Sequence, residues 1–244
     1  MTAAPVLHSE VLDRLGSEIV CGTQPIGSVL TLAGLEHDFG VSRTVVREAV
    51  RVLESMGMVE SKRRVGVTVL PKGEWSVLDT RLIRWRMNSP ERDAQLHTLT
   101  ELRLAIEPTA ARLAARKAAP DVGARLVELA GRLRALGELG RGADREYLDA
   151  DITFHSQLLL ASGNDMLAAH QGVVNEVLAG RTLQGLTPPW PVASSLDNHE
   201  GTARAVADGD EDRAECCARA VVMDVWHELR DVRFAPRACT VEAL

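Results

Sequence analysis

Three arginines stand at four-residue spacing near the N-terminus. Arg43, Arg47 and Arg51 fall on one face of a helix, because four residues make about one helical turn. Like charges at this spacing destabilise an isolated helix by roughly a few tenths of a kcal/mol per pair. Glu48 and Glu54 lie close enough to relieve only Arg51. The arginine face is therefore expected to meet a partner outside the helix.

The opposite face of this helix is apolar and is expected to be buried. Its predicted inner residues are Val45, Ala49, Val52, Leu53 and Met56. A shorter amphipathic segment precedes it, with Leu32, Leu35 and Phe39 on one side, and Gly40 ends that segment. Ser42 then stands where a helix N-cap is needed. Two short helices joined in this way are typical of a helix-turn-helix, whose second helix enters the major groove of DNA.

A basic β-hairpin is predicted directly after the arginine helix. Residues 59–63 and 65–69 have strand character, and the tip between them holds Arg63, Arg64 and Gly66. A glycine there allows the backbone to approach a sugar-phosphate chain closely. The alternative is a solvated surface helix followed by an ordinary hairpin, but helix face, turn glycine, cap and wing together favour DNA binding. The candidate DNA-binding residues are Arg43, Thr44, Arg47, Arg51, Arg63, Arg64 and Gly66.

Overall charge does not indicate a nucleic-acid binder, since the net charge is −6. Residues 1–70 hold seven Lys/Arg against eight Asp/Glu, so the basic charge is local. Useful phosphate affinity is therefore expected to need a dimer that doubles it. The chain shows no basic-then-apolar leader and no apolar run of about eighteen residues, so we expect a soluble cytoplasmic protein without a membrane partner.

The remainder of the chain has helical periodicity after Pro71-Lys72-Gly73, without a strand signal. The predicted helices cover residues 77–87, 91–118, 122–139, 144–162, 166–182, 195–207 and 211–233. The expected fold class is mainly α, with an N-terminal winged helix-turn-helix and an all-α helical bundle. The predicted parts are a DNA-binding domain (1–72), a linker with a connecting helix (73–90), an effector-binding and dimerisation domain (91–234) and a loose tail (235–244).

The run from Gly40 to Val50, with Gly57-Met58-Val59 leading into the wing, resembles the winged helix of GntR-type bacterial transcription regulators. Family members usually have proline where this chain has Val45. The bundle resembles the ligand-binding (FCD) domain of the FadR-type branch over residues 76–233. The stretch 78–85 is similar to the connecting segment of gluconate- and galactonate-responsive members.

The resemblance implies a ligand-responsive regulator. Such a protein binds a pseudo-palindromic operator as a homodimer, most simply as a repressor, and a small carboxylate or sugar acid releases it. By the same resemblance Arg43, Arg47 and Gly66 are operator-contacting positions.

A metal site is the second candidate feature. Asp151 and His155 stand at i and i+4, which suits a divalent metal but is also common in surface pairs. In the family pattern an aspartate and three histidines converge, and Asp151, His155 and His199 match the first three. The fourth position falls on Val221, which cannot ligate. Either zinc, nickel or manganese is held by three residues with water or effector oxygens, or the metal is lost and these residues contact the effector directly.

Arg103 falls on an arginine that family members place beside the effector pocket. On an otherwise apolar helix it suits bidentate capture of a carboxylate, but a salt bridge with Glu107 is an equal alternative. The predicted effector-binding residues are Arg103, Asp151, His155, His199 and Asn175, with Arg181 as a further candidate.

A competing reading is a metal-dependent enzyme that uses Asp151, His155 and His199 as a facial triad on iron. Such triads generally lie in β-barrels, and the sequence offers no nucleophile–base pair, so we expect no enzymatic activity.

Overall fold

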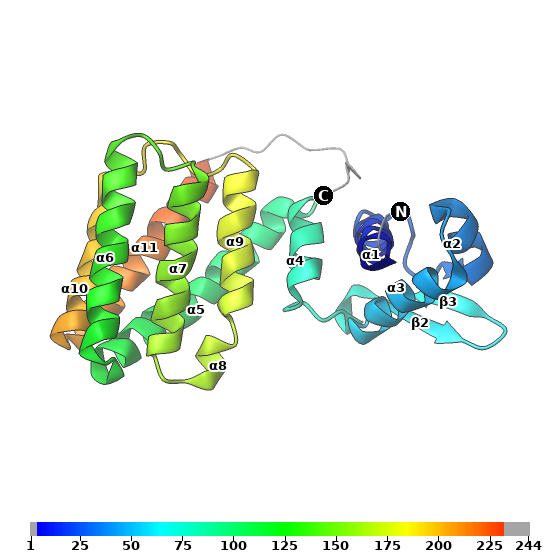
Figure 1. The fold of residues 1–244 in the computed structure, drawn as a ribbon, viewed down its shortest axis with the longest axis horizontal. Coiled ribbons are helices and arrows are strands. Elements are labelled where there is room, and N and C mark those ends of the chain that lie inside the picture. Colours follow the sequence, from blue (N-terminus) through cyan, green and yellow to red (C-terminus); the bar gives the residue numbers. More distant parts are fainter. Residues whose placement is uncertain (1–3, 232–244) are drawn as a thin grey trace. The chain divides into compact units, whose positions relative to one another are not determined.

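The computed structural model of the chain describes residues 4–231 and divides after Gln95 into two compact units (Figure 1). The first unit combines short helices with a small sheet, and the second is helical. The predicted fold class is therefore confirmed. The predicted tail 235–244 and the last residues of the final predicted helix lie outside the described residues.

The first unit has the arrangement of a winged helix-turn-helix. Its three strands form an antiparallel sheet in the order β1-β3-β2, with Lys62 opposite Gly66 next to the hairpin turn. The two-residue strand β1, which the sequence did not reveal, pairs Val29 with Thr68. The elements are α1 (Ala4–Val20), β1 (Val29–Leu30), α2 (Leu32–Phe39), α3 (Arg43–Ser55), β2 (Val59–Lys62), β3 (Gly66–Val69), a 3-10 turn (Lys72–Glu74) and α4 (Thr80–Met87).

The two helices of the motif have different starts. Thr31 caps α2, and its hydroxyl accepts a hydrogen bond from the backbone nitrogen of Gly34 at 3.0 Å. Gly40 ends α2 with a φ of 64°, in the left-handed region that favours glycine. Ser42 occupies the N-cap position of α3, but its side chain makes no capping hydrogen bond. The place of this cap agrees with the one predicted from the sequence.

The buried face of α3 includes the predicted Ala49, Leu53 and Met56 and differs from the predicted face at its edge. Its buried residues are Val46, Ala49, Val50 and Leu53. Val45 and Val52, which were predicted to be on the inner face, are only partly buried at the edge of the core. Both stripes fit a period of 3.6 residues, so the packing of α3 against α1 decides which one turns inward.

Helix α4 packs within the first unit, against α1. A Cβ atom on Gly16 would lie 2.4 Å from the ring of Trp85, so only glycine allows this approach. The indole nitrogen of Trp85 donates a hydrogen bond to Oδ1 of Asp13 at 3.1 Å. The helix that the sequence placed in a linker is thus part of the core of the N-terminal unit.

The second unit is a helical bundle in which α7 lies between α6 and α9 (Figure 1). Residues 164–183 form two helices instead of the single predicted one, because the chain turns between Ala168 and Gln171. The bundle elements are α5 (Arg92–Lys117), α6 (Pro120–Glu138), α7 (Arg145–Ala161), α8 (Asp165–Ala168), α9 (Gln171–Leu183), α10 (Ala193–Asp208) and α11 (Glu211–Asp231). Among residues 4–231, no helix has the length and apolar character needed to span a membrane.

Candidate effector cavity and nucleic-acid interface

A small cavity of about 40 Å³ lies inside the helical bundle. Its wall combines charged and polar side chains from α5, α7, α9, α10 and α11 with a few apolar ones. The polar groups used below are Arg103, Tyr147, Asp151, His155, Arg181 and His199. A space of this size holds a metal ion or a few waters, because one water needs roughly 10–15 Å³ of such volume.

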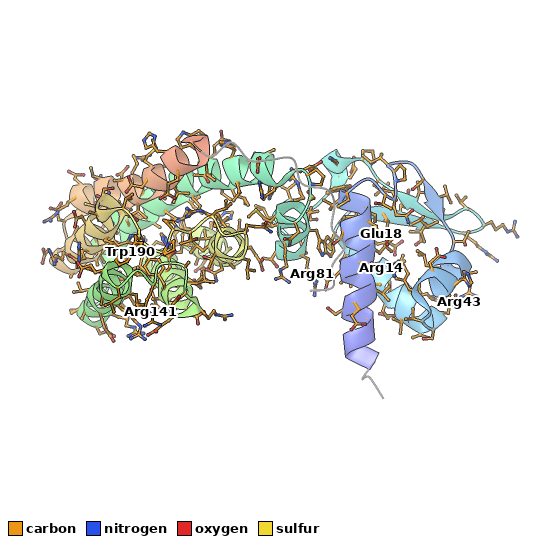
Figure 2. The ribbon with its side chains drawn as sticks, turned by 90° about the horizontal axis from the view of Figure 1, so that it is seen from above. Arg14, Glu18, Arg43, Arg81, Arg141 and Trp190 are labelled. Carbon is orange, nitrogen blue, oxygen red and sulfur yellow. The ribbon has the colours of Figure 1, made fainter. Side chains whose placement is uncertain are left out.

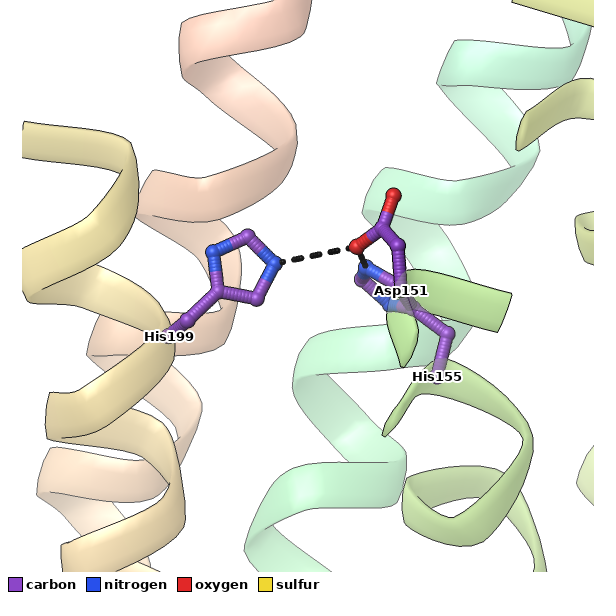
Figure 3. Close-up of side chains that lie close together, drawn as sticks. All are labelled: Asp151, His155 and His199. Atoms are coloured by element: carbon purple, nitrogen blue, oxygen red, sulfur yellow. Dashed lines mark ion pairs between the residues drawn. The ribbon is translucent and has the colours of Figure 1, made fainter. Parts of the chain in front are cut away.

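Asp151, His155 and His199 meet at this cavity (Figure 3). Asp151 and His155 lie one turn apart on α7, and His199 reaches them from α10. The Nε2 atoms of both histidines lie 3.4 Å from Oδ1 of Asp151. One ligand atom from each of the three residues lies within 4.8 Å of the others, which is a possible metal-binding arrangement.

The outer nitrogens of the two imidazoles each lie close to an oxygen atom. Nδ1 of His199 lies 2.6 Å from the backbone oxygen of Ser195, and Nδ1 of His155 lies 2.6 Å from Oε2 of Glu107. These partners assign the proton to Nδ1 in each neutral ring, so the lone pair of Nε2 faces Asp151. Two lone pairs directed at a carboxylate oxygen repel it unless a cation or a proton lies between them. The donor set therefore fits a divalent metal, with Glu107 and Ser195 orienting the ligands.

The electrostatics of the cavity favour a positive charge at this point. Burial alone would lower the pKa of His155, but Glu107 and Asp151 raise it to about 9. Burial would raise the pKa of Asp151, but the neighbouring imidazoles of His155 and His199 outweigh it and hold that pKa below its usual range. Without a metal the site is thus balanced by an imidazolium at His155. A metal would replace that proton.

Arg103 forms the salt bridge that the sequence left open. Its Nε pairs with Oε1 of Glu107, and its Nη2 lies 3.3 Å from Oε2, with both side chains 1% exposed. Burial would raise the pKa of Glu107, but Arg103 and His155 lower it to about 2. Arg103 also lies beside the metal candidates, since Nη2 is 3.4 Å from Nε2 of His155.

Helix α11 contributes no imidazole to the cavity. Val221, at the position of the family's fourth ligand, is buried in the wall. Asp224 and Glu228 follow it on the same face at later turns and also line the cavity. The cavity thus has an acidic wall on this helix.

Asn175, a predicted effector-binding residue, is not among the residues that line the cavity. It accepts a hydrogen bond from the hydroxyl of Ser156 at 3.0 Å. Arg181, six residues later on α9, lines the cavity instead. Six residues rotate the helix so that these two side chains point roughly 120° apart.

Several residues of the site were missed in the sequence. Tyr147 lies four residues before Asp151, so the i, i+4, i+8 row that ends at His155 is a signal that was available. Glu228 was also missed: its Oε2 lies 2.6 Å from Nη2 of Arg181, a residue that the sequence did suggest, although the two are distant in the chain. No local pattern predicts such a pair.

The arginines of α3 lie on the surface of the first unit, where Arg43 is labelled in Figure 2. Arg43 and Thr44 are exposed, and Nε of Arg43 is 3.8 Å from Oε1 of Glu36. Arg51 pairs with Glu48 as expected. Within residues 4–231, the exposed side chain of Arg47 has no ion-pair or hydrogen-bond partner.

The wing carries exposed arginines at its tip. Arg63 and Arg64 are exposed, and Arg64 has a positive φ of 65°. Gly66 has a φ of 124°, and a Cβ atom there would lie 2.6 Å from the backbone oxygen of Leu30. The fold itself therefore requires this glycine for the approach of β1, whatever the wing contacts.

Comparison with protein families gives two matches. Residues 7–69 match the family described as "Bacterial regulatory proteins, gntR family", and residues 98–224 match the family described as "FCD domain". The chain is 29% identical over 228 residues to the galactonate operon transcriptional repressor of Escherichia coli K12, covering 91% of this chain and 96% of that protein. It is 28% identical over 223 residues to the uncharacterised HTH-type transcriptional regulator YieP of the same strain, covering 91% and 95%.

A solved structure has a related fold. It is that of Lar, which controls the expression of the Listeria monocytogenes agr system, with a TM-score of 0.57 at 15% identity. The likeness covers 96% of this chain and 99% of that one. At this identity it shows the fold alone.

Proposed function

Because the chain belongs to the FCD branch of the gntR family of bacterial regulators, and is a DNA-binding transcriptional regulator and no enzyme, we propose that it is a repressor released by a small carboxylate. It binds a pseudo-palindromic operator as a homodimer, and a sugar acid is the favoured class of effector. Similarity to the galactonate operon repressor supports both the repressor role and the effector class.

One observation carries the DNA-binding part of the proposal. Helix α3 buries one face in the core and leaves Arg43, Arg47 and Arg51 on the other, where Arg47 has no partner within residues 4–231. An exposed arginine next to the start of a recognition helix suits contacts with guanine edges or phosphates. Arg63, Arg64 and Gly66 of the wing then follow the neighbouring backbone.

The test begins with selection of a binding site from random duplex DNA by the full chain. Arg47→Ala is expected to weaken binding to the selected site by about 1–3 kcal/mol per half-site, measured by fluorescence anisotropy. Arg51→Ala is the matched control, and its loss should be smaller because Glu48 already pairs with Arg51. Equal binding by folded Arg47→Ala and unchanged protein would contradict the assignment of α3.

The proposal of a homodimer depends on the affinity of a single winged helix for DNA. One winged helix with local basic charge binds weakly, and two related by a two-fold axis recognise half-sites about one helical turn apart. Sedimentation of the full chain should show a dimer at micromolar concentration. The selected DNA should contain an inverted repeat, and a single unrepeated half-site bound by a monomer would overturn this part.

The effector site is proposed at the bundle cavity. Asp151, His155 and His199 would hold zinc, nickel or manganese, and the bound metal would supply a positive charge that attracts a carboxylate oxygen. Because Val221 gives no ligand, a coordination position stays open for water or effector. The alternative, direct contact of these residues with the effector, predicts the same response without metal.

The size of the cavity bears on regulation. Drug-sized ligand pockets measure roughly 300–1,000 Å³, far more than the cavity of about 40 Å³. A sugar acid must therefore enlarge the bundle, and a ligand that prefers the enlarged state shifts the protein toward it. This difference between states can lower operator affinity.

Thermal unfolding with galactonate and gluconate, each with and without zinc, tests the effector site. A ligand that binds only the folded state raises the melting temperature. His199→Ala should abolish the rise that depends on zinc. A rise that is unchanged in this variant would remove His199 from the site.

A further inference from the structure

Arg181 is a buried cation in the cavity wall whose hydrogen bonding is incomplete. Its side chain is 8% exposed, and Nη2 lies 2.6 Å from Oε2 of Glu228. Its Nε is buried and has no hydrogen-bond partner within residues 4–231. A buried N–H donor without an acceptor is unfavourable, so this atom is suited to an oxygen that enters the cavity.

Arg103 differs from Arg181 in which of its atoms is left without a partner, since it is the Nη1 of Arg103 that is buried and has no hydrogen-bond partner within residues 4–231. Its Nε and Nη2 atoms, the edge that would make a two-point contact with a carboxylate, are already used by Glu107. Glu107 in turn holds Nδ1 of His155. If Arg103 left Glu107 for an effector, a carboxylate that is 1% exposed would lose its main counter-ion. Arg103 thus holds Glu107 in place and, through Glu107, positions His155.

The cavity wall on α11 restricts which chemical groups the effector can carry besides one carboxylate. Asp224 and Glu228 both line the cavity. Asp224 accepts hydrogen bonds from the hydroxyl of Ser194 at 3.2 Å and from the side-chain nitrogen of Asn198 at 3.4 Å. Two carboxylates favour ligand groups that donate hydrogen bonds, such as hydroxyls, and repel a second anionic group.

From these contacts we infer that the effector is a hydroxylated monocarboxylate whose carboxylate binds Arg181, and that Asp224 and Glu228 exclude dicarboxylates. The inference rests on the proposed effector site and makes it more specific. Arg181 takes the capturing role that the family resemblance gave to Arg103. Hydroxyl groups of the effector donate to the α11 wall.

Matched acids test this inference by isothermal titration calorimetry on the full chain with one equivalent of zinc. Galactonate and galactarate share one carbon skeleton and differ in carrying one or two carboxylates, and glycerate and tartronate form a shorter pair. We expect the monocarboxylate of at least one pair to bind about tenfold or more tightly than its dicarboxylate, since like charges in a buried site repel strongly.

Variants separate the two parts of the inference. Arg181→Gln should weaken the bound monocarboxylate by about tenfold or more, whereas Arg181→Lys, which keeps the charge, should lose less. Glu228→Gln should reduce the preference for the monocarboxylate, because the repulsion falls. Arg145→Gln is the control on α7, since its side chain is 83% exposed and lies outside the cavity wall.

The outcomes are distinguishable. Equal binding of mono- and dicarboxylates, or unchanged binding by folded Arg181→Gln, overturns this inference and leaves the proposed function in place. If Arg181→Gln does not fold, the Glu228→Gln result decides, and an unchanged preference overturns the role of the α11 wall. Failure of all four acids to bind the unchanged protein overturns the proposed effector class together with this inference.

Discussion

The arginines of α3 and the arginines of the bundle cavity face opposite conditions. The side chain of Arg43 is 68% exposed with one distant ion-pair partner, whereas that of Arg103 is 1% exposed and held by Glu107. A solvated cation loses little free energy when it has no partner, but a buried one must be paired. Unpaired charge at the surface is therefore free to bind DNA, and the paired charge in the cavity is fixed in place before any ligand arrives.

The two regions also differ in the interactions that stabilise them. Helix α3 is held by its buried apolar face, and its arginines contribute little to stability. The cavity is held partly by its charges, because Glu107 serves Arg103 and His155 at once. Removing charge should then reduce binding in the first region and stability in the second.

The largest expected effect follows from removing that shared carboxylate. Glu107→Ala should lower the free energy of unfolding by about 3–5 kcal/mol, since it leaves a buried guanidinium and a buried imidazole without their acceptor. Urea unfolding followed by circular dichroism measures it. Asp149→Ala is the control, because it breaks the exposed pair with Arg145 and should change stability little. Equal losses in the two variants would erase the contrast between buried and exposed charge.

A backbone contact in the wing should also affect stability, although it lies in the unit whose exposed charges contribute little to it. Gly66→Ala places a Cβ atom 2.6 Å from the backbone oxygen of Leu30 at a φ of 124°. We expect a loss of about 1–3 kcal/mol in the stability of the first unit. Gly73→Ala is a matched control, because a Cβ atom there meets nothing within 4 Å. Identical melting temperatures for the two variants would show that β1 can move to accommodate the added Cβ atom.

Local patterns explain most of what the sequence predicted. The arginine row, Gly40 and the hairpin each depend on residues within a few positions, and they gave the helix-turn-helix and its wing. The inner face of α3 was predicted in part: Ala49 and Leu53 are buried as expected, but packing against α1 buries Val46 in place of the equally apolar Val45. Strand β1 was missed because its two residues are strand only through pairing with β3.

The cavity depended on contacts that are distant in the chain. Asp151 and His155 are neighbours on one helix, but only the family resemblance indicated His199. Glu107 holds His155 from another helix, and its spacing from Arg103 suggested no more than a salt bridge. The pair of Arg181 and Glu228 joins α9 to α11. Such partners follow from the packing of the bundle, which periodicity does not specify.

A substitution in the wall of the cavity should increase its affinity for metal. Val221→His restores an imidazole to the wall, and we expect zinc affinity to rise by about tenfold or more because a fourth ligand completes a tetrahedral set. Competition with a chelating dye measures it. Val225→His, one turn further along the same wall, should give no comparable gain. Equal affinity in the Val221→His variant and the unchanged protein would mean that α11 does not face the metal.

The smallest expected effect concerns the starts of α2 and α3. Thr31→Ala removes the hydroxyl that accepts from the backbone nitrogen of Gly34, and it should cost about 1 kcal/mol. Ser42→Ala should cost much less, because the side chain of Ser42 makes no capping hydrogen bond. Both are surface changes in one motif, so chemical unfolding of the two variants compares them directly. Equal losses would mean that the hydroxyl of Ser42 caps α3 in solution. The arginine helix would then depend on its own first turn as well as on the apolar face that it packs against α1.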